Sequence, residues 1–317
     1  MNKKAYIHIG PPKTGSTSIQ NILFSNQGEL NKLGVLYPNA GILQRGEGYY
    51  LNRGQGHRRF EQGPDVCHQL LPWELKGTLE NYSKNSWSDL LQEIEKSDCD
   101  KIILSAEGFF GLNEGQINIV FEHLKKYDPK IIAYFRHPYK RSKSLYNQMV
   151  KRGKVSESFE SFVKGYYLKS AQRDFKKIVT WIQIFGETKV VIKPFDKLTK
   201  SNSLSFDFLS EIGIDVSNMN TTEQRLNSSL NPISIKALRI LNFIQPKNKK
   251  GPLLSFFFNP LRFKTFSLLR KPFFGKTKYT HKKDDELSRE LISSLGKEYL
   301  NLVKKHFKKE DWNLYLK

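Results

Sequence analysis

Short apolar runs alternate with helical patterns through the first two thirds of the chain, and this alternation limits the possible folds most strongly. The runs have few polar interruptions, which is typical of strands that are buried on both faces. Strands that alternate with helices form parallel sheets. We therefore expect an α/β fold with a three-layer parallel sheet flanked by helices. The expected strands are Ala5–Ile9, Val35–Tyr37, Lys101–Ser105, Lys130–Phe135 and Thr188–Lys193.

Helical periodicity accounts for much of the remaining chain. The length suits a single domain of residues 1–317, with a core of about residues 1–200 and a helical C-terminal extension of about residues 201–317. A glycine-rich, polar and aromatic stretch at 39–86 is long for a loop, so we expect short helices there and a role in walling a binding cleft. The expected helices are 16–25, 89–96, 116–126, 138–153, 159–167, 171–185, 233–244 and 284–308.

The composition restricts the partners and the compartment. The 52 Lys and Arg residues exceed the 31 Asp and Glu residues, which gives a net charge of +21. Such a surface attracts nucleotides, acidic glycans, anionic lipid or nucleic acid, although a solvated basic face explains the charge equally well. Cys67 and Cys99 form no CxxC pair, which disfavours disulfides and a cysteine metal site. With no apolar run of about 18 residues and no visible secretory signal, we expect a cytoplasmic protein.

A loop rich in glycine, proline and hydroxyl residues follows the first expected strand and opens a helix. Its sequence from residue 7 to residue 18 is IHIGPPKTGSTS. Backbone N–H groups at such a helix start, together with the helix dipole, bind anions. Gly10 and Gly15 allow a tight turn and the close approach of a phosphate. The sequence therefore predicts a phosphate-binding loop and a P-loop NTPase-like sheet.

The loop departs from the GxxxxGK[ST] pattern of nucleotide triphosphatases at one position. Ser16 stands where that pattern has its lysine, and the lysine has moved back to position 13. No expected strand ends in an aspartate that would hold Mg²⁺. These differences disfavour a standard NTPase or kinase.

The segment HIGPPKTGSTSIQ resembles the 5′-phosphosulfate loop of sulfotransferases that use 3′-phosphoadenosine 5′-phosphosulfate (PAPS), especially the bacterial and carbohydrate type. A second segment, YFRHPYKRSKSLY at 134–146, resembles the family's 3′-phosphate motif. Arg136 and Ser144 keep that motif's spacing of eight residues. The resemblance covers about residues 5–195 and implies sulfuryl transfer from PAPS, with PAP as the second product.

The resemblance also implies roles for individual residues. Lys13 would stabilise the bridging oxygen of the leaving phosphate, and Arg136 with Ser144 would bind the 3′-phosphate. Arg225, in a polar loop before the helix at 233–244, is a further candidate contact with PAPS. No metal is required by this scheme. The loop residues expected to bind the 5′-phosphosulfate are Pro12, Lys13, Thr14, Gly15, Ser16, Thr17 and Ser18.

An acceptor must also lose a proton, so the sequence should contain a general base. Glu107 is the first candidate, because it follows the strand at 101–105 and glutamate serves as base in carbohydrate-type members. The alternative role for Glu107 is that of a helix cap or an ion-pair partner. His57 and His68, in the long loop, are the rival candidates for the base. We expect His8, within the first strand, to be a packed core residue.

The acceptor class follows from the carbohydrate-type motif, which favours a glycan or glycolipid over a small phenol or alcohol. The basic residues of the long loop either contact an acidic acceptor or are solvated. The segment Leu253–Phe274 is rich in Phe and Leu with interspersed Lys and Arg, so it is either a peripheral membrane contact at the inner face or core packing. The loop residues in question are Arg45, Arg53, Arg58 and Arg59.

Two other classes of function stay open on the sequence alone. One is a nucleotide kinase or NTPase with an atypical P-loop, and Mg²⁺-dependent nucleotide binding would identify it. The other is a non-enzymatic polyanion-binding protein, which the net charge suits, although no nucleic-acid module is visible. Salt-dependent binding without preference for a 3′-phosphate would identify that class.

Overall fold

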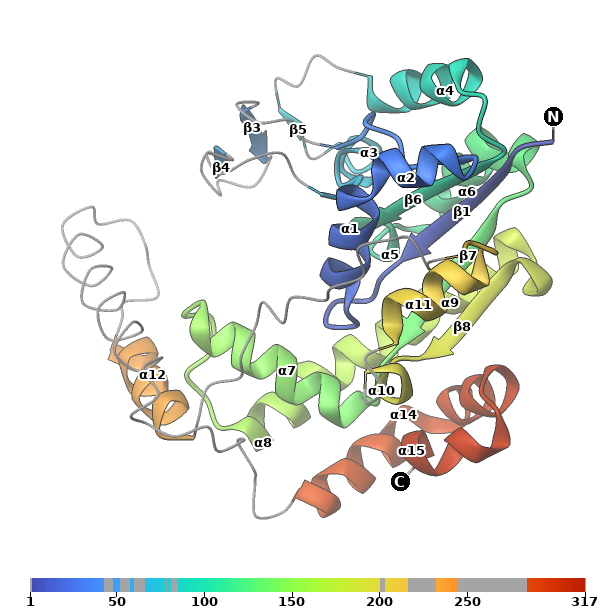
Figure 1. Cartoon of the computed structure of the whole chain (residues 1–317). Coiled ribbons are helices and arrows are strands. Elements are labelled where there is room, and N and C mark those ends of the chain that lie inside the picture. Colours follow the sequence, from blue (N-terminus) through green and yellow to red (C-terminus); the bar gives the residue numbers. More distant parts are fainter. Residues whose placement is uncertain are drawn as a thin grey trace. The chain divides into compact units, whose positions relative to one another are not determined.

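The computed structural model of the chain (Figure 1) describes residues 2–42, 48–51, 58–59, 66–77, 79–80, 85–199, 203–215, 232–244 and 284–316. These residues fall into two compact units that alternate along the chain. The first unit takes the described residues of Met1–Arg136, Arg173–Gln224 and Leu302–Trp312, and the second those of His137–Gln172, Arg225–Asn301 and Asn313–Lys317. The expected division into a core and a C-terminal extension stays a prediction.

A five-stranded sheet in the order β2-β6-β1-β7-β8 is the centre of the first unit. Every neighbouring pair in this sheet is parallel, which confirms the predicted α/β fold class. The last strand starts two residues later than expected, because the preceding residues Glu187–Lys189 form a 3₁₀ turn. The strands are β1 (Lys4–Ile9), β2 (Val35–Leu36), β6 (Lys101–Ala106), β7 (Lys130–Phe135) and β8 (Val190–Pro194).

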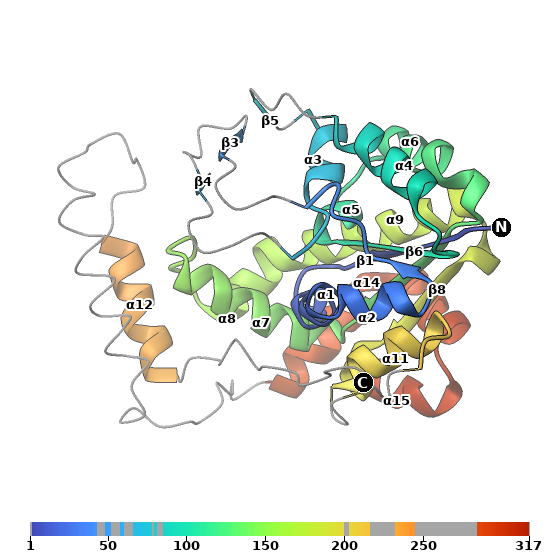
Figure 2. The ribbon, with the colours of Figure 1, turned by 45° about the horizontal axis from the view of Figure 1, so that its top comes forward.

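Helices cover both faces of this sheet (Figure 2). On one face, Tyr6, Ile103 and Ile132 from three strands pack in one core with residues of α1, α2, α10 and α11. On the other face, the Phe135 ring lies 6.4 Å from Phe110 and 5.9 Å from Phe175, which belong to α5 and α9. The helices are α1 (Ser16–Ser25), α2 (Gln27–Lys32), α5 (Glu107–Phe110), α6 (Glu114–Leu124), α9 (Leu168–Phe185), α10 (Phe195–Leu198) and α11 (Leu204–Glu211).

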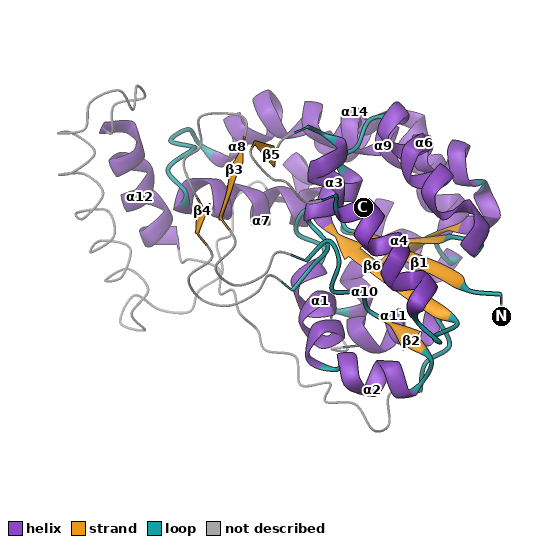
Figure 3. Cartoon of the chain, turned by 90° about the horizontal axis from the view of Figure 1, so that it is seen from above, coloured by secondary structure: helices purple, strands orange, loops and turns teal. Residues whose placement is uncertain are grey.

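The view from above (Figure 3) shows α1 and α2 on one side of the strands and α6 and α9 on the other. Among its described residues, the long segment after β2 holds the short helix α3 (Leu70–Leu75), and short helices were expected there. It also holds a small antiparallel sheet that we did not expect, made of β3 (Gly48–Leu51), β4 (Arg58–Arg59) and β5 (Leu79–Glu80). Helix α4 (Ser86–Lys96) follows and begins earlier than expected, because Asn85 caps it by accepting a bond from Ser88 N–H.

A polar network fixes α11 to the edge of the sheet at β7 and β8. The buried Tyr134 hydroxyl donates to Asp207 Oδ2 at 2.8 Å. Lys193 bridges the two carboxylates of α11, at 3.0 Å from Asp207 and 2.6 Å from Glu211. Burial and the neighbouring Asp207 carboxylate raise the pKa of Tyr134, so its hydroxyl stays protonated and donates.

The second unit is helical. Helix α7 (Pro138–Lys151) starts with a proline at a position that tolerates it, as predicted. Asn242 of α12 (Pro232–Ile244) donates to the carbonyls of Val150 and Val155 at 3.0 and 2.7 Å, which ties α12 to the end of α7.

Two expected helices of the second unit are less regular than predicted. The helix expected at 159–167 consists of α8 (Phe159–Phe162) and a π-helical turn at Val163–Tyr167. Helix α14 (Asp284–His306) is interrupted at Gly296, whose φ of 76° is left-handed. Among the residues described here, no helix is long and apolar enough to cross a bilayer.

We predict that Tyr134→Phe lowers the free energy of unfolding by about 1 kcal/mol, because Asp207 loses the hydrogen bond from a buried hydroxyl. Tyr127→Phe is the matched control, since its hydroxyl donates to the half-exposed Glu95, where water can replace it. Urea unfolding of both variants measures the difference. Equal losses in the two variants would contradict a special role for the Tyr134 network.

Candidate functional site

The register of the parallel sheet brings three strand ends to one edge. Ile9 of β1 pairs with Ala106 of β6, so Gly10 and Glu107 leave the sheet side by side. On the other side of β1, strand β7 runs parallel and ends at Phe135, so Arg136 leaves at the same edge. The carboxyl edge of a parallel sheet is the usual ligand side of α/β folds. The sequence-predicted loop, base and arginine therefore meet within the first unit.

The loop after β1 has a turn that its own side chains stabilise. Lys13 and Gly15 both have left-handed backbone angles, with φ of 75° and 78°. Between them, the buried Thr14 hydroxyl donates to the Pro11 carbonyl at 2.7 Å. The Thr14 proton is thus used within the loop, and binding of the 5′-phosphosulfate by Thr14 stays a prediction.

Close packing also requires a glycine at position 15. A Cβ atom there would lie 2.4 Å from Leu204 Cδ2 and 2.8 Å from Phe195 Cε2. These side chains come from α11 and α10, so the loop rests directly on the helices that cover the sheet. A larger residue would push the loop away from them.

The N-terminus of α1 is free of the usual side-chain caps. Gly15 is its N-cap residue, it provides no side-chain hydrogen bond, and the first turn has no acidic residue. Ser16 is 1% exposed, and its hydroxyl has no hydrogen-bond partner among the residues described. Thr17 is exposed and Ser18 is partly buried. Backbone N–H groups, the helix dipole and these hydroxyls together suit an anion.

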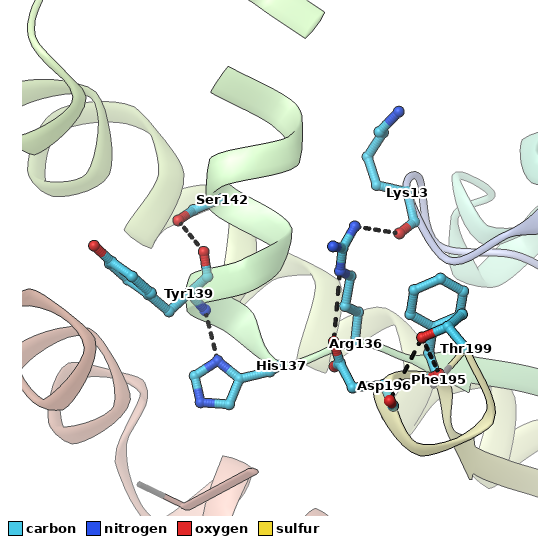
Figure 4. A network of polar contacts seen from close by, with 8 residues as sticks. All are labelled: Lys13, Arg136, His137, Tyr139, Ser142, Phe195, Asp196 and Thr199. Carbon is cyan, nitrogen blue, oxygen red and sulfur yellow. Dashed lines mark hydrogen bonds and ion pairs between the residues drawn. The ribbon is translucent and has the colours of Figure 1, made fainter. Parts of the chain in front are cut away.

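Arg136 is held beside this loop by several contacts (Figure 4). Its Nη1 donates to the Lys13 carbonyl at 3.3 Å, and its Nε lies 3.8 Å from Asp196 Oδ1. Its guanidinium carbon is 5.3 Å from the centre of the Phe195 ring. The Lys13 side chain points away from this guanidinium, so two cationic groups from different strand ends are presented at the same loop (Figure 4).

Asp196 and Phe195 are site residues that the sequence reasoning missed. Asp196 is 6% exposed and follows β8 at the carboxyl edge. Its position three residues after the end of the strand expected at 188–193 was a usable signal, since polar residues near such strand ends often face the ligand side. Asp196 orients the guanidinium of Arg136, and Phe195 supports its face.

Ser144, the expected partner of Arg136, lies in α7 of the second unit, where it is partly buried. Two neighbours shape the start of that helix (Figure 4). His137 Nδ1 accepts from Tyr139 N–H at 3.1 Å, and the Ser142 hydroxyl donates to the Tyr139 carbonyl at 2.7 Å. Joint phosphate binding by Arg136 and Ser144 stays a prediction.

Glu107 is exposed at the first position of the short helix α5. Strand β6, which it follows, pairs with β1 as expected. The carboxylate thus leaves the sheet beside the start of the phosphate loop. Its role as a base stays a prediction.

His68 is wrongly placed among the candidate bases. It is 0% exposed, and both ring nitrogens are engaged. Its Nδ1 accepts from Ser105 N–H at 3.1 Å, so Nε2 carries the proton and donates to the Pro38 carbonyl at 2.9 Å. Burial lowers its pKa to about 4. A ring without an available lone pair cannot take a proton from an acceptor.

His8 is a packed core residue, as predicted. It is fully buried between the rings of Tyr134 and Phe208, at 6.0 and 5.6 Å. Its Nδ1 lies 2.8 Å from Ser105 Oγ, and burial lowers its pKa to about 3.

Several expected site residues fall outside the described residues, namely Arg45, Arg53, His57, Arg225 and the segment Leu253–Phe274. Arg58 and Arg59 form strand β4, of which the backbone pairing is described. Within the described ranges, no group of three or more His, Cys, Asp or Glu residues is arranged to hold a metal ion.

Comparison with known proteins adds little at the level of sequence. No protein-family model matches the chain. An uncharacterized protein of Archaeoglobus fulgidus is 29% identical over 142 residues, which are 44% of this chain and 38% of that protein. The chain thus matches well under half of that relative's length.

Three solved structures are similar to the chain at a low level. A sulfotransferase of Alicyclobacillus acidocaldarius has a TM-score of 0.43 at 12% identity, over 85% of this chain and 96% of that one. The sulfotransferase domain of the curacin biosynthetic pathway has a TM-score of 0.39 at 10% identity, over 92% and 98%. The sulfotransferase domain of a Synechococcus olefin synthase has a TM-score of 0.36 at 12% identity, over 82% and 94%. Similarity at this level does not indicate a shared activity.

Two histidines that are 0% exposed, His8 and His68, make the stability of the fold sensitive to acid. In the unfolded chain, both histidines bind a proton below their ordinary pKa of 6.5. In the folded protein, burial lowers the pKa to about 3 for His8 and about 4 for His68, so both stay neutral down to those values. Stability therefore falls as the pH falls through this window, by about 2–3 kcal/mol per histidine between pH 7 and about pH 4.5.

Urea unfolding at both pH values, with wild type and His8→Asn, measures this effect. The loss of stability between the two pH values should be about 2–3 kcal/mol smaller in the variant, because one titrating group is removed. An unchanged slope would mean that His8 is protonated in the folded protein.

Proposed function

We propose that the protein is a PAPS-dependent sulfotransferase that transfers a sulfuryl group to a hydroxyl or amine of an acceptor. One observation carries the proposal. The loop of residues 10–18 opens the uncapped N-terminus of α1 at the carboxyl edge of the central strand, and Arg136 from the adjacent strand is bonded to that loop at the Lys13 carbonyl. This arrangement offers separate sites for two phosphate groups, as PAPS requires.

The residues fit such a donor substrate. The backbone N–H groups of the α1 start would bind the 5′-phosphosulfate oxygens, and the unpartnered Ser16 hydroxyl lies buried at the same place. Arg136 has a planar fork that suits the 3′-phosphate, and Asp196 limits its rotation. Ser144 is the proposed second ligand of that phosphate.

The chemistry needs positioning more than covalent participation. An acceptor oxygen or nitrogen attacks the sulfur atom, the bond from sulfur to the bridging oxygen breaks, and PAP leaves. Lys13 would stabilise the negative charge that develops on the bridging oxygen. Glu107 would take the acceptor proton, because it leaves the sheet beside the loop.

The proposed acceptor is a glycan or glycolipid. This part rests on the carbohydrate-type character of the loop sequence, and the net charge of +21 is compatible with an acidic glycan. A cytoplasmic location and a peripheral membrane contact through Leu253–Phe274 belong to the same proposal.

The position of the cations distinguishes this proposal from a kinase. At the place of the NTPase lysine stands Ser16, which is buried, and the loop lysine lies three residues earlier with a left-handed backbone.

We predict that Lys13→Ala lowers kcat for sulfuryl transfer by about 10²–10³-fold while PAP affinity changes little, because the ammonium acts on charge that develops during the reaction. Lys32→Ala, at an exposed position of α2, is the control and should leave both quantities unchanged. Radiolabelled sulfuryl transfer and calorimetry measure them. Unchanged kcat in the Lys13 variant would remove this residue from the mechanism.

We predict that Arg136→Ala weakens PAP binding by about 10–100-fold but 5′-AMP binding by much less, because AMP lacks the 3′-phosphate. Arg136→Lys should recover part of the affinity, since it keeps the charge without the bidentate fork. Calorimetric titrations of both nucleotides measure the effect. Equal losses for PAP and 5′-AMP would show that Arg136 does not recognise the 3′-phosphate.

A further inference from the structure

The segment that contains α3 is bonded to the chain on both sides of Glu107. Strand β2 pairs with β6 only as far as Ile102, so it does not cover the end of β6. His68 takes its place. Its N–H donates to the Ser105 carbonyl at 2.9 Å, and its Nδ1 accepts from Ser105 N–H at 3.1 Å. Both the N–H and the carbonyl of Ser105, two positions before Glu107, are therefore bonded to His68.

The residue directly after Glu107 is held in the same way. Gly108 N–H donates to Gln69 Oε1 at 3.1 Å, and Lys76 Nζ donates to the Gly108 carbonyl at 2.9 Å. Gln69 and Lys76 are the residues that flank α3 at its two ends. A Cβ atom at Gly108 would lie 2.1 Å from Gln69 Nε2 and 2.6 Å from Pro72 Cγ, so α3 lies directly on this peptide.

The clamping segment is itself fixed to the first unit. Leu70 N–H donates to the Gly41 carbonyl at 3.1 Å, and the buried indole of Trp87 donates to the Leu71 carbonyl at 3.1 Å. His68 Nε2–H donates to the Pro38 carbonyl at 2.9 Å. These bonds give α3 a defined place although it has only six residues.

We infer that His68, Gln69 and Lys76 are positioning residues that hold the Glu107 backbone in the orientation required for proton transfer. The inference rests on the proposed function, in which Glu107 is the base. This role suits the buried, neutral ring of His68. Binding of the Ser105 backbone requires an acceptor at Nδ1 and a donor at the His68 N–H, and neither has to titrate.

Glu107 needs such support because its own element provides little. Helix α5 has four residues, and Glu107 is exposed at its first position. A short, exposed helix start moves easily, and a displacement of about 1 Å at a reacting group can cost about 100-fold in rate. The four bonds to Ser105 and Gly108 restrict this motion at the backbone.

The contact between Lys76 and the Gly108 carbonyl is partly shielded from water. Burial and the ammonium of Lys177 lower the pKa of Lys76 to about 8. Removing the Lys76 amine from water costs free energy, and its hydrogen bond to the Gly108 carbonyl offsets part of that cost.

The test compares Gln69→Met, which removes the acceptor for Gly108 N–H, with Gln69→Glu, which keeps it. Gln116→Met is the structural control, because Gln116 donates to the Leu75 carbonyl of the same helix at 3.0 Å without contacting Gly108. For each full-length protein, PAP affinity, kcat, KM for PAPS, and hydrogen exchange of residues 105–110 are measured.

We expect Gln69→Met to lower kcat by about 10–100-fold, with KM for PAPS and PAP affinity unchanged and with faster exchange at 105–110. Gln69→Glu should restore the slow exchange. Its added carboxylate, beside Gly108, should also move the acid limb of the kcat–pH profile to higher pH, because a like charge raises the pKa of Glu107. Gln116→Met should keep wild-type kcat even if its unfolding temperature falls.

Two results would overturn the inference in distinguishable ways. If wild type binds no PAP, the proposed function fails, and the positioning role fails with it. If PAP binds normally but Gln69→Met keeps wild-type kcat, or Gln116→Met loses as much kcat as Gln69→Met, the proposed function stands and α3 has only a structural role.

Discussion

The parallel pairing of β1 with β6 on one side and β7 on the other is the constraint on which the candidate site depends. Because the three strands run in the same direction, Gly10, Glu107 and Arg136 leave the sheet at one edge although they are far apart in sequence. Buried apolar side chains on both faces hold this register, since a slip of one strand by one residue would move every side chain to the opposite face and disrupt the packing there. The positions of the loop, the carboxylate and the guanidinium therefore follow from core packing.

Much of the first unit could be predicted from the sequence. The strands at β1, β6 and β7 are continuous apolar runs, and the glycines and prolines around them mark their ends. The short elements were missed, including α10 and the three strands β3, β4 and β5, because a period cannot be detected over two to four residues. The break of α14 at Gly296 was also missed, since a glycine inside a helical pattern is often tolerated.

The candidate site was predictable in its residue types but less so in their bonds. The loop sequence indicated an anion site, and the structure places the uncapped start of α1 there. The sequence did not show that Thr14 uses its proton within the loop, because that bond depends on the local turn. Nor did it show that His68 pairs with Ser105, since this contact joins residues 37 positions apart and forms only where β2 stops short. For the same reason the sequence left His68 among the alternative bases, whereas its buried ring bonds to the backbone of Ser105.

The central claim is that the loop and Arg136 together bind a nucleotide with both a 5′- and a 3′-phosphate. Calorimetric titration of the wild-type protein with PAP, 5′-AMP and ATP, each with and without Mg²⁺, tests it most directly. The account predicts that PAP binds at least about 10-fold more tightly than 5′-AMP and that Mg²⁺ changes neither affinity. Mg²⁺-dependent binding of ATP, or no binding of PAP, would contradict it.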